Sequence, residues 1–198
     1  MSWTVVVATT NTGKFAEIRA ALRDLGLRVA PLAAFPQVGE LPETGDSFEA
    51  NALQKARACR EATGLPVMAD DSGLEIDFLD GRPGVHSSRF AGESASDEER
   101  NRLVLDVMRD AGPGQRTARF RCVIALVGLC DEPITVEGVC EGEIATAPRG
   151  EHGFGYDPIF LLPDRGVTMA ELPREQKNLI SHRGKALSEL RKRLTAAL

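Results

Sequence analysis

Cysteine is scarce in this chain of 198 residues, and its spacing excludes two common uses of the residue. Cys59, Cys122, Cys130 and Cys140 form no Cys-x-x-Cys pair, which argues against a zinc ribbon and against a dithiol redox motif. Disulfides are not implied either. We expect buried free thiols.

A membrane-spanning segment is also missing. No apolar run is long enough to cross a bilayer, and Met1-Ser2-Trp3-Thr4 lacks the basic and apolar regions of a signal peptide. These absences predict a cytoplasmic protein with no membrane partner. With 42% hydrophobic residues, the chain can bury a sizeable core, either as one domain over residues 1–198 or as two closely joined lobes.

Positive charge is in deficit, since 24 Lys and Arg stand against 29 Asp and Glu and the formal net charge is -5. This balance argues against a nonspecific surface for duplex nucleic acid, so no nucleic-acid partner is expected. A small anionic ligand needs only a local cluster of cations. Any phosphate site must therefore be local.

One stretch contains two adjacent aspartates, whose negative charges need compensation if they are buried. Ala69-Asp70-Asp71-Ser72-Gly73 follows the apolar run Leu65-Pro66-Val67-Met68, so we expect the Asp pair at the end of a buried strand, with a half-exposed strand over 74–78 after it. Buried like charges favour a metal or proton-transfer site, although a turn is equally compatible with these residues. Neighbouring strand residues point to opposite faces, so Asp70 and Asp71 should not share one role.

A polar loop joins the first predicted strand to the first helix. Residues 4–8 read as a buried strand that runs into Thr9-Thr10-Asn11-Thr12-Gly13-Lys14, and a helix follows. Unpaired N–H groups and a Lys at a helix N-terminus favour an anion such as phosphate. The loop is not a Walker A motif, and from this stretch alone a capped helix with a solvated Lys is the favoured interpretation.

The second predicted helix begins at a capping box, Asp46-Ser47-Phe48-Glu49, and ends at Gly64. Phe48, Ala52, Ala56 and Cys59 recur at helical spacing and should face the core. Asn51 and Lys55 lie one turn apart and could line a site. From the pattern alone, a solvated pair is the favoured interpretation.

The second half of the chain predicts further strands and loops. Residues 96–99 begin a capped helix that we interpret as scaffold, and long strands over 118–129 and 134–144 can pair as a hairpin. The Gly-rich run 150–158 precedes a strand at 159–162, and its aromatics could stack on a base, although such loops are common. Residues 177–185 gather Lys177, His182 and Arg183, which suit a polyphosphate or are simply solvated.

Taken together, these motifs resemble one family, the inosine/xanthosine triphosphate pyrophosphatases. The resemblance covers nearly the whole chain and rests on six motifs in order. They are Thr9-Thr-Asn-Thr-Gly-Lys14, Glu43-Thr-Gly, Phe48-x-x-Asn-Ala52-x-x-Lys-Ala56, Ala69-Asp-Asp-Ser-Gly73, Gly153-Phe-Gly-Tyr-Asp-Pro158 and Ser181-His-Arg-Gly184.

The resemblance implies an α/β fold with a long mixed sheet, bent over a central cleft between two lobes and flanked by helices. It implies a homodimer in which residues 1–198 form a single catalytic domain. The activity would be Mg²⁺-dependent hydrolysis of ITP, dITP or XTP to the monophosphate and pyrophosphate. Such an enzyme removes deaminated purines from the nucleotide pool.

The resemblance also assigns roles to individual residues. Asp71 resembles the general base and a metal-linked carboxylate, with Glu43 as the second acidic group at Mg²⁺. Glu49 is displaced by one position from the family's Glu, about 100° round a helix, so a metal role for it is in doubt. The resemblance makes Thr9, Thr10, Asn11, Thr12, Gly13 and Lys14 the phosphate-contacting loop and Phe154, Gly155, Tyr156 and Asp157 the base-recognition residues. The further expected substrate contacts are Ser72, Lys177, His182 and Arg183.

Two other enzyme classes fit the sequence less well. A Ser hydrolase is set aside because His86, Ser87 and Ser88 give no triad from sequence alone. A dehalogenase-type phosphatase would need Asp-x-Asp spacing to place two acids on one side of a strand. The alternative that stays open is a non-catalytic regulatory protein that binds nucleotide through the cationic loops.

Overall fold

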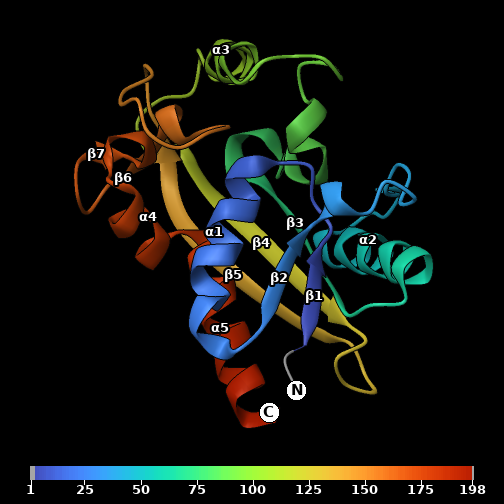
Figure 1. Ribbon diagram of the computed structural model, residues 1–198. Coiled ribbons are helices and arrows are strands. Elements are labelled where there is room, and N and C mark those ends of the chain that lie inside the picture. Colours follow the sequence, from blue (N-terminus) through green and yellow to red (C-terminus); the bar gives the residue numbers. More distant parts are fainter. Residues whose placement is uncertain (1–2, 198) are drawn as a thin grey trace. The chain divides into compact units, whose positions relative to one another are not determined.

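The computed structural model describes residues 3–197 and contains a seven-stranded sheet in the order β2-β1-β3-β4-β5-β6-β7 (Figure 1). β1 is parallel to β2 and β3, whereas β6 is antiparallel to β5 and β7. The predicted α/β class and mixed sheet are confirmed. The strands are β1 (Thr4–Val7), β2 (Arg28–Pro31), β3 (Val67–Ile76), β4 (Thr117–Val127), β5 (Ile134–Ile144), β6 (Phe160–Leu162) and β7 (Val167–Thr168).

Five α-helices are described: α1 (Thr12–Leu22), α2 (Phe48–Thr63), α3 (Asp97–Val107), α4 (Arg174–Ile180) and α5 (His182–Ala197). Short 3-10 turns connect several of these elements, including η4 (Gly84–Arg89) and η5 (Asp157–Ile159). In the described part of the chain, none of the helices combines the length and the apolar character that crossing a membrane requires. Met1 and Ser2, which begin the segment used in the signal-peptide argument, lie outside the described residues.

The chain divides into two compact units. Unit 1 comprises Met1–Asp71, Cys122–Gly138 and Arg183–Leu198, and unit 2 comprises Ser72–Arg121 and Val139–His182. Since the first boundary falls between Asp71 and Ser72, the Asp pair closes one unit and Ser72 opens the other. β3, β4 and β5 each contribute residues to both units.

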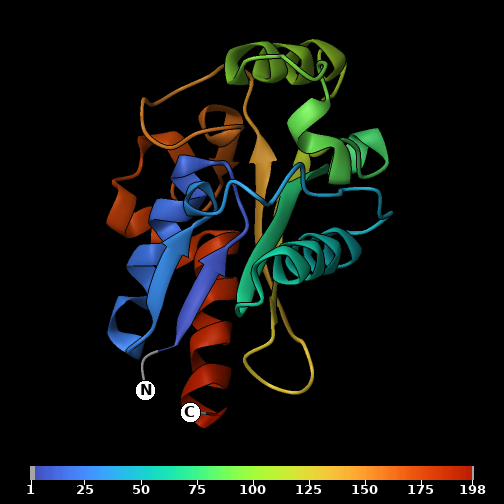
Figure 2. The ribbon, with the colours of Figure 1, turned by 45° about the vertical axis from the view of Figure 1, so that its right-hand side comes forward.

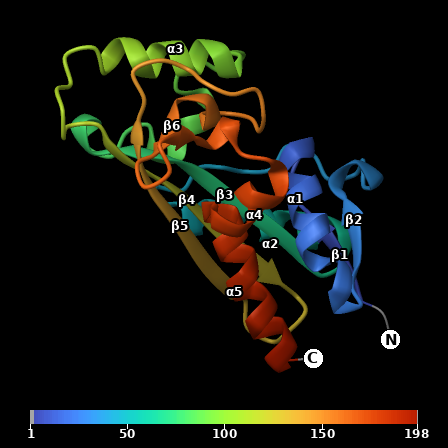
Figure 3. The same cartoon turned by 90° about the vertical axis from the view of Figure 1, so that its left-hand side faces the viewer.

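Unit 1 buries its core where α1 and α5 pack on the sheet. Ile18 and Leu22 of α1 and Leu190 of α5 are fully buried in the same apolar cluster as Val5 and Met68. Arg191 of α5 also donates a hydrogen bond to the carbonyl of Ala21, at the end of α1. In Figure 2, α2 and α5 lie on opposite sides of β3. Figure 3 shows α1 and α5 on the same side of the sheet.

Unit 2 has a core of its own, built on β3, β4, β5 and β6. Leu74, Ile76 and Phe160 are fully buried, and the rings of Phe120 and Phe160 stack with their centroids 4.2 Å apart. Val104 and Met108 bring α3 onto this cluster. The helix that the sequence predicts as scaffold therefore packs partly on the core.

Three local predictions are wrong. β3 is continuous from Val67 to Ile76, so the Asp pair lies within a strand and not at its end, because each carboxylate finds partners that compensate its burial. The N-cap of α2 is Ser47, whose side chain accepts from Ala50, so the predicted capping box at Asp46 does not form. Cys59, Cys122 and Cys140 are buried free thiols as expected, but Cys130 is exposed.

Candidate active site

The two aspartates of β3 are buried and have separate partners. Asp70 is 2% and Asp71 7% exposed. Asp70 pairs with Lys14 and Arg183, whereas Asp71 pairs with Lys55 and accepts a hydrogen bond from Asn51. Alternating side-chain directions along a strand account for the two different partner sets.

Asp71 is held by two residues of α2. The Nζ of Lys55 lies 3.0 Å from its Oδ1, and the Nδ2 of Asn51 donates to its Oδ2 over 3.1 Å. Residues four apart on a helix share a face, so both side chains reach the same carboxylate. The interpretation of Asn51 and Lys55 as a solvated pair is therefore wrong, since both are buried against Asp71.

Glu43 meets Asp71 at the same ammonium group. The Nζ of Lys55 lies 2.7 Å from Oε1 of Glu43, so one cation bridges the two carboxylates. The side chain of Glu43 is 34% exposed, in contrast to the nearly buried Lys55. The two acids that the sequence assigned to a metal thus converge on one point, and one of them reaches solvent.

Burial sets the protonation chemistry of this cluster. Desolvation raises the pKa of Asp71, and the neighbouring Lys55 charge offsets this only in part. Burial alone would lower the pKa of Lys55, but Asp71, Asp70 and Glu43 outweigh it and raise the value. Asp71 is thus a stronger base than an ordinary aspartate, next to an ammonium that stays charged.

Asp70 has the opposite pKa shift. Burial would raise its pKa, but the charges of Lys14 and Arg183 dominate and hold the pKa well below the usual range. The Nζ of Lys14 lies 3.0 Å and the Nε of Arg183 3.3 Å from Oδ2 of Asp70. Arg183 is itself buried, and its Nη1 donates to Oε2 of Glu17 over 2.7 Å. Asp70 therefore stays ionised between two cations.

The predicted phosphate loop caps α1. Asn11 is the N-cap residue, its side chain accepts a hydrogen bond from the backbone N of Lys14 over 2.9 Å, and its own N–H donates to Oγ1 of Thr9. The helix is therefore capped, but Lys14 is not a solvated cation, because its side chain is only 18% exposed and pairs with Asp70.

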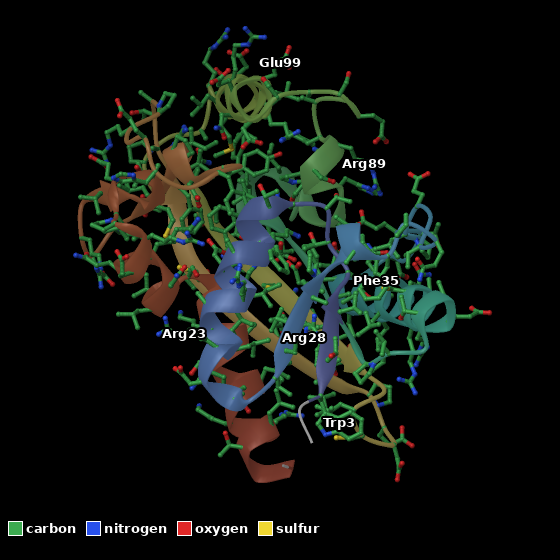
Figure 4. All side chains as sticks on the ribbon, viewed as in Figure 1. Trp3, Arg23, Arg28, Phe35, Arg89 and Glu99 are labelled. Carbon is green, nitrogen blue, oxygen red and sulfur yellow. The ribbon has the colours of Figure 1, made fainter. Side chains whose placement is uncertain are left out.

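Beside this loop lies a pocket of about 370 Å³. Thr9, Thr10, Asn11 and Thr12 line one part of it, and the chain from Pro31 to Gly39 lines much of the rest. Phe35, on that second segment, is labelled in Figure 4. Polar groups at a helix N-terminus thus border an apolar recess.

Unit 2 holds the predicted base-recognition residues. Phe154 and Gly155 are half-buried, whereas Tyr156 and Asp157 are buried. Tyr156 donates through its hydroxyl to the carbonyl of Ser87 over 2.8 Å. Oδ2 of Asp157 accepts from the backbone N of Phe154 over 2.9 Å, so Tyr156 and Asp157 support the loop from inside.

Lys177 and His182 also pack within unit 2. The Nζ of Lys177 lies 2.5 Å from Oδ2 of Asp157 and 4.6 Å from the ring centroid of Phe154, within the range of a cation–π contact. The ring of His182 stacks on Phe120 with centroids 4.7 Å apart. Ser72 is half-buried and follows Asp71 directly on β3.

Comparison with known proteins decides the family. The model of the Ham1 family matches residues 5–193. The chain belongs to the Ham1 family. It is 51% identical to the dITP/XTP pyrophosphatase of Nitratidesulfovibrio vulgaris over 94% of this chain and 93% of that protein, and 49% identical to the one of Geobacter sulfurreducens over 96% of each. The structure of a HAM1 protein from Coxiella burnetii matches with a TM-score of 0.90 and 47% identity, covering 98% of this chain and 99% of that one.

The resemblance read from six motifs is thus confirmed at the level of the Ham1 family. The structure adds neighbours that the motif analysis did not assign to the site. Lys55 and Asn51 were signalled by their one-turn spacing, and Glu17 lies one turn beyond Lys14 on α1. Ser87, which accepts from Tyr156, and Asp97 and Asn101, which hydrogen-bond to the backbone of Gly155, come from segments that carry no motif.

This Ham1 chain should lose much of its stability when Asp70 is neutralised. Asp70→Asn leaves Lys14 and Arg183 without their shared buried counter-charge, and breaking a buried pair in this way costs about 3–5 kcal/mol of the free energy of unfolding. Urea denaturation measures the change. The control Asp24→Asn, in an exposed pair with Arg23, should stay within about 0.5 kcal/mol of the wild type.

The same pair predicts how stability depends on pH. The folded pKa of Asp70 lies below its unfolded value, so its contribution is present above the unfolded pKa of about 3.9 and is lost as pH falls through the folded pKa. As pH falls below about 4, the free energy of unfolding, measured by urea denaturation, should decrease less steeply in Asp70→Asn than in the wild type. Equal decreases in the two proteins would contradict the lowered pKa of Asp70.

Proposed function

We propose that this chain hydrolyses dITP, ITP and XTP to the monophosphate and pyrophosphate. The observation that carries the proposal is its near-full-length identity of about 50% to curated dITP/XTP pyrophosphatases. The geometry of unit 1 supports it independently, because a buried carboxylate, a bridging ammonium and a capped helix N-terminus supply a base and cations.

Asp71 is the proposed general base. Water attacks a triphosphate slowly, because phosphoryl oxygens repel the nucleophile and charge builds on the leaving pyrophosphate. A carboxylate with a raised pKa accepts the proton of that water more readily than an ordinary one. Asn51 and Lys55 hold the carboxylate in one orientation, which is the positioning that such chemistry requires.

The phosphates have donors in unit 1. The loop from Thr9 to Lys14 offers hydroxyls and the N-terminal N–H groups of α1, whose dipole favours an anion. The ammonium of Lys14 adds a full charge and is partly exposed. We assign Thr9, Thr10, Asn11, Thr12, Gly13 and Lys14 to phosphate binding, with Asp70 keeping Lys14 in place.

Glu43 and Asp71 fit a divalent metal. Both offer carboxylate oxygens, and Lys55 shows that these oxygens converge on one cation. Within residues 3–197 no group of three or more His, Cys, Asp or Glu is arranged for a metal, but Mg²⁺ is commonly held by one or two carboxylates together with substrate phosphates. When bound there, Mg²⁺ would supply charge stabilisation of the phosphoryl oxygens and a lower pKa for its water.

In this proposal, unit 2 recognises the purine base of the nucleotide. Phe154 offers a half-exposed ring, backed by Lys177, and Gly155 and Tyr156 continue the loop. Ser72, Asp157, His182 and Arg183 complete the proposed substrate set, with the buried Asp157 and Arg183 acting through the groups they hold. We further propose that both units form one catalytic domain, and that the enzyme is a cytoplasmic homodimer.

A nucleotide panel tests the activity. We expect purified protein with Mg²⁺ to release pyrophosphate from ITP, dITP and XTP with kcat/KM at least about tenfold above that for GTP and ATP, because roughly 1.4 kcal/mol of discrimination gives that factor. A coupled pyrophosphate assay measures it. If ITP is turned over no faster than GTP, the proposed specificity is wrong.

Replacing the general base, Asp71, separates catalysis from nucleotide binding. Asp71→Asn keeps the size of the side chain but removes the proton acceptor, and turnover of ITP should fall roughly a hundredfold or more while nucleotide still binds. The matched control is Glu49→Gln, an exposed acid on α2, expected within twofold of the wild type. Undiminished turnover in Asp71→Asn would remove Asp71 from the mechanism, whereas a wild type that binds nucleotide without turning it over would indicate the regulatory, non-catalytic alternative.

Metal dependence forms a separate prediction. EDTA should abolish turnover of ITP and added Mg²⁺ should restore it, since two carboxylates and phosphate oxygens are the expected ligands. Glu43→Gln should raise the Mg²⁺ concentration needed for half-maximal rate, whereas Glu49→Gln should not. Full activity in excess EDTA would remove the metal from the proposal.

A further inference from the structure

Helix α3 contacts the base-recognition loop, residues 154–157, through two side chains that no motif includes. Oδ2 of Asp97 accepts a hydrogen bond from the backbone N of Gly155 over 2.6 Å, and Nδ2 of Asn101 donates to the carbonyl of Gly155 over 3.0 Å. Residues four apart share a helix face, so both reach one glycine. We propose that Asp97 and Asn101 are positioning residues that set selectivity for the purine base, an inference that rests on the proposed function.

The two bonds fix the backbone on both sides of one Cα atom. Gly155 has a φ of +65°, a left-handed conformation that glycine adopts without strain. A flexible residue gains a defined conformation when both its N–H and its carbonyl are held. Helix α3 therefore constrains the two peptide groups that join Gly155 to Phe154 and Tyr156.

Burying the side-chain amide of Asn101 costs free energy, and its hydrogen bond to Gly155 explains why a polar residue stands at this position. Asn101 is 5% exposed, and within residues 3–197 its Oδ1 has no hydrogen-bond partner. Burying a polar group without a partner is unfavourable, and an apolar side chain would pack the helix without that cost. The amide is thus useful for the one bond it donates to the loop.

Asp97 is itself held in place. It is the first residue of α3, after the N-cap Ser96, whose capping box with Glu99 is complete. Glu99 is labelled on this helix in Figure 4. Arg100 pairs with Oδ1 of Asp97, leaving Oδ2 for Gly155, and also donates to the carbonyl of Ser88 over 3.0 Å. The acceptor therefore sits on a rigid helix start.

Residues of unit 2 outside α3 support the rest of the loop. Asp157 accepts from the N–H of Phe154 and pairs with Lys177, and Tyr156 bonds to Ser87. Both backbone groups of Gly155 are bonded to α3. A loop ordered in advance lowers the conformational cost of binding, so releasing Gly155 should weaken base binding more than the chemical step.

The test compares Asn101→Ala and Asp97→Ala with Glu98→Gln. Glu98 is exposed on the same helical turn, and Glu98→Gln makes the same charge change as Asp97→Ala without touching the loop. We expect KM for ITP to rise roughly 3- to 10-fold in the first two variants, the factor that loss of one hydrogen bond gives. The ratio of kcat/KM for ITP over GTP should fall, kcat should stay within about twofold, and Glu98→Gln should match the wild type.

A second measurement keeps the two proposals separate. Hydrogen exchange of the amides of residues 154–156 should accelerate in Asn101→Ala and in Asp97→Ala, whatever the activity. The side chain of Asp97 is 43% exposed, so Asp97→Ala should fold even if Asn101→Ala does not. Unchanged exchange, or faster exchange with KM and the ITP:GTP ratio unchanged, would overturn the inference. A wild type that fails to prefer ITP would overturn the proposed function, and exchange would still decide whether α3 holds the loop.

Discussion

Unit 1 depends on how two adjacent carboxylates stay ionised inside a strand. Like charges on neighbouring residues of β3 would not both be tolerated in a buried position without cations. Lys14 and Arg183 compensate Asp70 on one side, and Lys55 compensates Asp71 on the other. These cations come from α1, α5 and α2, so the charge balance of one dipeptide determines where three helices can begin or pack.

The same arrangement explains why the two acids differ in character. Asp70, with two cations, has a depressed pKa and serves as a fixed counter-charge. Asp71, with one ammonium and one amide, has a raised pKa because desolvation dominates. Adjacent residues of identical chemistry thus acquire separate roles from the elements that face them, which is how environment divides work between paired carboxylates.

The order of the motifs predicted the family, and the α/β fold class followed from that resemblance. Periodic patterns predicted most elements, such as the helix over 48–63, whose apolar positions recur every three or four residues, and the strands near 118 and 134, where apolar residues alternate. They misplaced the Asp pair at a strand end, because Ser and Gly mimic a turn while the compensating cations are distant in sequence. Arg183 lies 113 residues from Asp70, and Lys55 read as solvated for the same reason. Asp97 and Asn101 carry no signal at all, since a polar residue on an amphipathic helix is ordinary.

The four cysteines provide a built-in reporter of folding. Burial raises the pKa of Cys59, and for Cys122, which also lies near Asp70, it raises the pKa to about 12. Such thiols are protonated at neutral pH and shielded from reagents. Cys130, on the connection from β4 to β5, is exposed. A thiol reagent should therefore modify one position on the native protein and reach the other three only as the chain opens, so the number of labels per chain measures how much of it has unfolded.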